Sequence, residues 1–125
     1  MDLYKEELMD HFRHPRNKGL VQNADFASES CNPSCGDSVS MSGTVVGTVL
    51  SVVQFQGKGC VISQAAASML TQRATGMALE DVQAVDVNFM LKLVGIPLGP
   101  NRTRCALLAL EALHKGIATY SSGRE

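Results

Sequence analysis

The sequence predicts a single α+β domain, and three observations lead to this prediction. Residues 37–57 are rich in valine and threonine and show the alternation of antiparallel strands. The segments on both sides carry apolar residues at helical spacing. The chain has 125 residues, of which 45% are hydrophobic, and this is enough for one buried core. We therefore expect one domain over residues 1–125, in which residues 121–125 form a flexible polar tail.

The first predicted helix covers residues 2–14. Tyr4, Leu8 and Phe12 recur every four residues, with charged residues on the other faces, and Pro15 ends the helix. Residues 17–33 are rich in glycine, asparagine, aspartate and serine, which favours a loop. Within this loop, residues 24–28 can form one short edge strand.

Residues 37–57 predict a β-hairpin. Apolar residues alternate in both halves of the segment: Val39, Met41 and Val45 in the first, Val53 and Phe55 in the second. Gly47 and Thr48 fit a two-residue turn that begins with glycine, and Gly43 offers a competing bend. In either case the segment is expected to form antiparallel strands.

Three further helices are predicted after the hairpin. In residues 61–76, alanine, methionine, leucine and glutamine favour a helix that Ser63 can cap and that Gly76 can end. Residues 79–93 predict one helix, which the two glycines and two prolines of residues 95–101 terminate. The last helix is expected to run from near Thr103 to Tyr120. Its buried stripe comprises Leu107, Leu110, Leu113 and Ile117.

Charge and hydropathy exclude several classes of protein. The formal net charge is −1 and the 11 lysines and arginines are scattered, which argues against a nucleic-acid-binding surface. The first 20 residues are too charged for a signal peptide, and no apolar run approaches the ~20 residues of a membrane span. We therefore expect a soluble, cytoplasmic protein. In that compartment the four cysteines stay reduced, as buried filler, reactive thiols or metal ligands.

Three of the cysteines occupy positions that favour a reactive thiolate or a metal ligand. Cys35 lies in the turn that enters the hairpin, Cys60 precedes a helix, and Cys105 lies in the first turn of the last helix. The positive end of a helix favours the thiolate, which binds metals and attacks sulfur. Asp37 adds a harder ligand, which is more easily displaced from zinc or iron. The sequence therefore predicts a metal site that opens at Asp37.

The glycines before Cys60 support this interpretation. Gly57 and Gly59 flank Lys58, and glycine lets the backbone adopt positive φ and lets another group approach closely. A loop that lines a ligand site uses this conformational freedom.

Alternatives remain for these residues. A free cysteine also fills space in a core, and the spacing of the thiols matches no C-x-x-C finger. Cys31 is interpreted as an incidental cysteine, with an auxiliary thiol as the alternative. We expect His11, His14 and His114 to be surface or capping residues.

Four segments resemble the IscU/SufU/NifU-type iron–sulfur scaffold family, in the family's order: DHFRHPRNKG, NPSCGD, FQGKGCVISQAAASMLT and RCALLALEAL. The resemblance implies a SufE/NifU-like α+β fold, with a small antiparallel sheet of about three strands against several helices. It also implies a metal and cluster site formed by Cys35, Asp37, Cys60 and Cys105. The implied function is to accept persulfide sulfur from a cysteine desulfurase, assemble a transient [2Fe–2S] cluster and transfer it to apo iron–sulfur proteins.

Two branches of this family imply different functions. GKGCVIS, ASMLT and Arg104 resemble the SufU branch, which implies bound zinc and a zinc-dependent sulfurtransferase that activates the desulfurase without holding a cluster. The interval between Cys60 and Cys105 resembles IscU instead, although LGPNR replaces the chaperone-binding segment of IscU. Zinc and iron therefore both remain candidates, and a structural zinc domain that only binds partners is a third interpretation. The candidate persulfide acceptors are Cys35 and Cys105.

Overall fold

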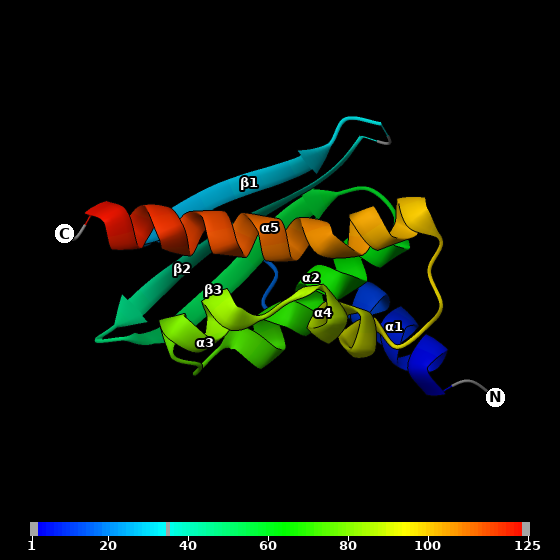
Figure 1. Ribbon diagram of the computed structural model, residues 1–125, viewed down its shortest axis with the longest axis horizontal. Coiled ribbons are helices and arrows are strands. Elements are labelled where there is room, and N and C mark those ends of the chain that lie inside the picture. Colours follow the sequence, from blue (N-terminus) through cyan, green and yellow to red (C-terminus); the bar gives the residue numbers. More distant parts are fainter. Residues whose placement is uncertain (1–2, 35, 124–125) are drawn as a thin grey trace.

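The computed structural model describes residues 3–34 and 36–123, and it confirms the α+β prediction (Figure 1). A sheet of three antiparallel strands, in the order β1-β2-β3, packs against helices. The elements are α1 (Leu3–Arg13), β1 (Phe26–Asn32), β2 (Asp37–Val46), β3 (Val49–Lys58), α2 (Val61–Ala74), α3 (Leu79–Ala84), α4 (Val87–Val94) and α5 (Pro100–Gly123). Helices α2 and α5 lie against the sheet, and α1 packs on α2.

The predicted hairpin is confirmed. Strands β2 and β3 are joined by Gly47 and Thr48, and Gly47 has φ 63°, a value that glycine adopts at little cost. Four of the residues predicted to alternate are at most 1% exposed: Val39, Met41, Val53 and Phe55. Val45, the fifth, is only partly buried, and the register of β2 and β3 shifts between Thr44 and Val45. Strand β1 pairs along β2, from Phe26 opposite Gly43 to Asn32 opposite Asp37, and so extends beyond the predicted short strand.

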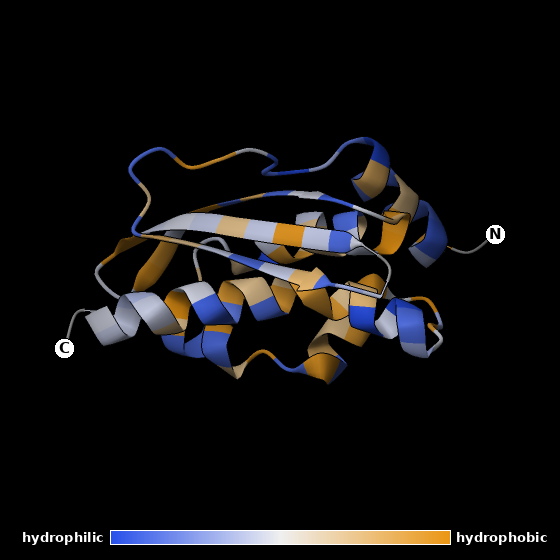
Figure 2. Ribbon diagram, turned by 90° about the horizontal axis from the view of Figure 1, so that it is seen from above, coloured by the Kyte–Doolittle hydropathy of each residue, from blue (hydrophilic) through white to orange (hydrophobic). Residues whose placement is uncertain are grey.

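The connection from α1 to β1 runs along the face of the sheet opposite α5 (Figure 2). It begins as a strap at residues 17–19, which pairs with the outer edge of β3. The backbone N–H of Phe55 donates to Asn17 O, and the N–H of Gly19 donates to Phe55 O, at 2.9 and 2.8 Å. The N–H of Val21 then donates to Ser42 Oγ at 3.0 Å. The strap therefore gives β3 a partner on both sides.

Helix α5 supplies one wall of the core. Its 24 residues begin at Pro100, three residues before the predicted start, because proline fits the first position of a helix. Of the predicted stripe, Leu110, Leu113 and Ile117 are buried, whereas Leu107 is only partly buried against the core. Gly116 lets the helix approach β1, since a Cβ at this position would lie 2.7 Å from the ring of Phe26. Within residues 3–34 and 36–123, no helix is both long and apolar enough to cross a bilayer.

Two further features of the helices differ from the prediction. The single helix expected over residues 79–93 is split into α3 and α4, because Asp86 caps a new helix and its Oδ1 accepts a hydrogen bond from Phe89 N at 2.9 Å. The N-cap of α2 is Cys60 and Ser63 lies inside the helix, so the predicted Ser63 cap was wrong. Gly76, with φ 91°, follows the C-cap of α2 as predicted.

The buried face of α1 is rotated from the predicted stripe. Leu8 is buried, but Tyr4 is 57% exposed and Phe12 is 38% exposed. His11, expected to be a surface or capping residue, is 4% exposed, and its Nδ1 lies 2.7 Å from Ser68 Oγ on α2. Burial lowers the pKa of His11 from its ordinary value of 6.5. The expectation of a surface or capping residue was therefore wrong, because α2 offers a hydroxyl on this side of α1.

Candidate metal centre

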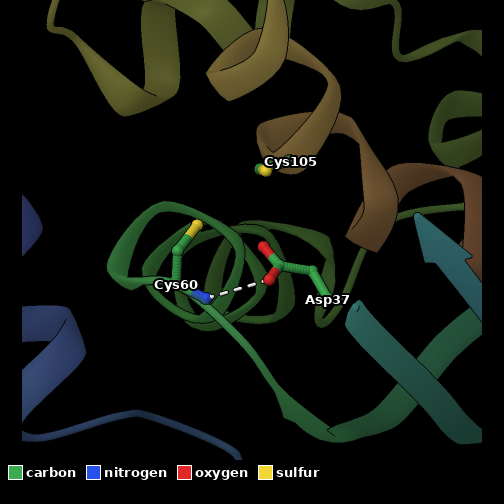
Figure 3. Close-up of side chains that lie close together, drawn as sticks. All are labelled: Asp37, Cys60 and Cys105. Atoms are coloured by element: carbon green, nitrogen blue, oxygen red, sulfur yellow. Dashed lines mark hydrogen bonds between the residues drawn. The ribbon is translucent and has the colours of Figure 1, made fainter. Parts of the chain in front are cut away.

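Three of the four predicted ligands come together at one end of the sheet (Figure 3). Asp37 is the first residue of β2, and Cys60 is the N-cap of α2. Cys105 lies in the second turn of α5 and not in the first turn as predicted, because α5 begins at Pro100. One carboxylate oxygen and the two Sγ atoms all lie within 4.8 Å of one another. Cys35, the fourth predicted ligand, lies outside the described residues.

The Asp37 side chain packs against the loop before α2. The residue is 3% exposed, and its Oδ1 accepts a hydrogen bond from the backbone N–H of Cys60 at 3.2 Å. Gly59 has φ 134°, and a Cβ at this position would collide with the Asp37 carboxylate. The close approach predicted for the glycines before Cys60 is therefore confirmed at Gly59, and the group that approaches is Asp37.

The Asp37 carboxylate is only partly hydrogen-bonded. Burial opposes its ionisation, but the nearby polar groups of Cys60, Cys105 and Ser63, including the Cys60 N–H that bonds Oδ1, outweigh burial and hold the pKa of Asp37 below its ordinary value of 3.8. The carboxylate is thus ionised at neutral pH. Its Oδ2 is buried and has no hydrogen-bond partner. A buried, negatively charged oxygen without a partner is costly, and a cation beside it would remove that cost.

The two thiols differ in access. Cys105 is 6% exposed, whereas Cys60 is exposed. Ser63, fully buried, holds the Cys60 turn: its hydroxyl donates to Cys60 O at 3.1 Å, and its Oγ lies 4.0 Å from Cys60 Sγ. Gln64 Nε2 donates to Ser63 Oγ at 3.1 Å. The site therefore has a solvent-facing side at Cys60 and a closed side at Cys105.

The donor set fits a metal ion. Zinc accepts thiolate and carboxylate ligands in tetrahedral geometry, and iron–sulfur clusters are held mainly by thiolates. The three described residues supply one donor fewer than a tetrahedral site requires, and Cys35 is two residues from Asp37. Together with the unpartnered Asp37 oxygen, this arrangement suits either zinc or an iron–sulfur cluster.

The remaining cysteine lies apart from this centre. Cys31 is exposed on β1 and pairs with Ser38, whereas Asp37 pairs with Asn32. Because successive residues of a strand face opposite sides of the sheet, Cys31 and Asp37 lie on opposite faces. Sequence reasoning did not identify Ser63 as a support of the centre. The signal was its position three residues after Cys60, one helical turn away.

Comparisons with known proteins match nearly the whole chain. The profile of the NifU-like N-terminal domain family matches residues 3–125. The zinc-dependent sulfurtransferase SufU of Bacillus subtilis is 33% identical over 138 aligned residues, which cover 97% of this chain and 93% of the relative. The iron–sulfur cluster assembly scaffold protein IscU of Escherichia coli is 30% identical, with 98% and 97% covered. The crystal structure of a putative SUF-system scaffold protein from Fervidobacterium islandicum superposes with a TM-score of 0.79 at 25% identity, covering 90% of this chain and 94% of that chain.

Proposed function

Since the chain belongs to the NifU-like N-terminal domain family, we propose that it is an iron–sulfur cluster assembly scaffold. In this function it accepts persulfide sulfur from a cysteine desulfurase, assembles a [2Fe–2S] cluster with iron and transfers the cluster to apo iron–sulfur proteins. The observation that carries the proposal is the convergence of Asp37, Cys60 and Cys105, whose donor atoms lie within 4.8 Å of one another. The similarity to a scaffold protein over 98% of this chain supports it.

The proposed ligands are Cys35, Asp37, Cys60 and Cys105. A bound ion would keep the thiolates ionised and ordered. Asp37 is the ligand to be released first, because a carboxylate is a harder donor than a thiolate and binds soft centres less firmly. Its Oδ1 retains the Cys60 N–H as a partner after release, so the loop before α2 keeps its shape.

Sulfur acceptance requires an ionised and accessible thiol. Cys35 and Cys105 are the proposed acceptors from the desulfurase. Because Cys105 is 6% exposed, incoming sulfur reaches it only after neighbouring side chains move. Cys35 precedes Gly36, whose φ is 76° and which has open space around it.

Anaerobic reconstitution tests the scaffold function. The chain is incubated with iron, cysteine and a cysteine desulfurase, and the visible absorbance of a [2Fe–2S] cluster is followed. We expect a cluster in the wild type and in Cys31→Ser, since Cys31 lies on the other face of the sheet. Cys60→Ser and Cys105→Ser should lose most of the absorbance. A cluster that survives both substitutions would exclude this site as the assembly site.

A second candidate function is zinc-dependent sulfur transfer. It is favoured by 33% identity to a zinc-dependent sulfurtransferase, over 97% of this chain, and by a donor set of mixed sulfur and oxygen atoms. The same reconstitution distinguishes the two functions. Retained zinc, no cluster and faster desulfurase turnover would favour sulfur transfer, whereas cluster absorbance that moves to an apo-ferredoxin would favour the scaffold.

A further inference from the structure

A cavity of about 300 Å³ lies on the exposed side of the metal centre, between α1, the start of α2 and the start of α5. Its apolar walls include Leu8, Ile62 and Ile96, and its polar side chains are Lys5, Cys60 and Arg102. We call it the Cys60 cavity. Cys60 thus belongs both to this cavity and to the metal centre.

The size and lining of the Cys60 cavity suit a small ligand. Ligand sites in proteins begin at roughly 300 Å³, and most combine apolar walls with a few polar groups. Here the polar groups are two cations and a thiol, and no acidic residue of the described chain lines the cavity. The ionised Asp37 lies behind Cys60, in the metal centre, with a carboxylate oxygen within 4.8 Å of Cys60 Sγ. The charge of the lining therefore favours an anion with an apolar body.

The Cys60 thiol restricts the chemical class of the ligand further. Within residues 3–34 and 36–123, Cys60 is the exposed cysteine of the metal centre, and a compound in the cavity meets its side chain before it meets the buried Cys105. Disulfides and persulfides are the compounds whose sulfur–sulfur bond a cysteine thiolate attacks. A carboxylate on such a compound would complement Lys5 and Arg102.

We propose that the Cys60 cavity binds a small carboxylate-bearing sulfur compound, with its carboxylate held by Lys5 and Arg102 and its sulfur placed against Cys60. With a thiol persulfide as the ligand, the cavity is a second entry for sulfur, used by a small-molecule donor. This role in delivery rests on the proposed function, whereas binding and exchange at Cys60 do not.

The transfer step is balanced without an added oxidant or reductant. The Cys60 thiolate attacks the outer sulfur of the donor RS–SH. The sulfur–sulfur bond of the donor breaks, a new sulfur–sulfur bond forms at Cys60, and the product is Cys60–S–SH. The electron pair of the broken bond leaves on RS⁻, whose carboxylate still faces the cations. The proton on the transferred sulfur stays with it.

Thiol–disulfide exchange with two reagents of opposite charge tests this proposal. The variant Cys31→Ser/Cys35→Ser keeps Cys60 and Cys105, and the full chain is used without metal. It is treated with dithiodipropionate, which carries carboxylates, or with cystamine, which carries ammonium groups on a chain of the same length. Mass spectrometry locates the adduct. Each rate is divided by the rate at Cys60 in the same variant unfolded in urea, which cancels the intrinsic reactivity of the reagent.

We expect the normalised rate at Cys60 to be at least about tenfold higher for the anionic disulfide. Lys5→Gln/Arg102→Gln should remove this preference. Lys58→Gln removes one positive charge two residues from Cys60 but outside the cavity lining, and it should keep most of the preference. Equal normalised rates for the two reagents, or a preference that survives loss of Lys5 and Arg102, would overturn the proposal. Circular dichroism checks that each variant is folded.

The exchange assay contains no iron, desulfurase or cluster. A charge preference at Cys60 without cluster assembly would therefore uphold the cavity and reject the scaffold function. Cluster assembly without a charge preference would reject the cavity and leave the scaffold function in place.

Discussion

Replacing Gly59 with alanine should weaken ion binding by displacing the side chain of Asp37, the first residue of β2. The backbone of Gly59 has φ 134°, a conformation close to exclusive to glycine, and the added Cβ would collide with the Asp37 carboxylate. The backbone strain costs about 1–3 kcal/mol. Because Gly59 supports the Asp37 carboxylate, moving that carboxylate should lower zinc affinity about 10- to 100-fold, or about 1.4–2.8 kcal/mol.

Gly47→Ala provides a matched control for this experiment. Gly47 also has positive φ, at 63°, but a Cβ there has open space within 4 Å and the turn is remote from the ligands in sequence. We expect Gly47→Ala to lose about 1 kcal/mol of unfolding free energy and to keep its zinc affinity. Competition with a zinc chelator measures affinity, and urea unfolding measures stability. Unchanged zinc affinity in Gly59→Ala would refute the argument that Gly59 seats a ligand.

Three further predictions concern the rest of the fold. Burial lowers the pKa of His11 below 6.5, so as the pH falls the unfolded chain takes up the proton before the folded chain does. The free energy of unfolding should therefore decrease as the pH drops below about 6.5. His11→Gln should show a smaller loss in urea midpoint between about pH 7.5 and about pH 5.5. Asp86→Ala should cost about 1 kcal/mol in urea unfolding by uncapping α4, and Asp86→Asn should recover most of it. Gly116→Ala should cost about 1–3 kcal/mol through contact with Phe26, whereas Gly123→Ala, in open space on the same helix, should leave the thermal midpoint unchanged or raised.

The elements that the sequence predicted best depend on local rules. The hairpin follows from alternation of buried residues such as Met41 and Phe55 and from a glycine at the turn, and both signals act within a few residues. Gly76 likewise follows the C-cap of α2 with a positive φ that glycine adopts readily. Both signals can be recognised in the sequence without knowledge of what packs from elsewhere.

The errors arose where a partner distant in sequence decided the outcome. The face of α1 was misjudged because Ser68, 57 residues away, gives His11 a buried hydrogen bond. The break between α3 and α4 depends on whether Asp86 caps a helix or faces solvent inside one, and apolar spacing alone does not distinguish these outcomes.

The candidate metal centre depends both on local sequence signals and on contacts between residues distant in sequence. Positions at helix starts and the glycines before Cys60 marked its residues individually. Their gathering within 4.8 Å depends on how β2, α2 and α5 pack, which spacing along the chain does not reveal. The resemblance to a known family supplied that step. The Cys60 cavity carried no sequence signal, because Lys5 and Arg102 come from opposite ends of the chain.

The strap at residues 17–19 has a consequence for self-association. An exposed strand edge is a template on which another molecule can add a strand and begin a fibril. The strap occupies the backbone N–H and C=O of Phe55 and so blocks strand addition at that position of β3. At the opposite margin, the Lys115 ammonium donates to the carbonyl of Glu29 at 2.8 Å and places a positive charge beside β1. Charge of this kind discourages intermolecular strand addition, so each margin of this small sheet carries a feature that opposes pairing with another molecule.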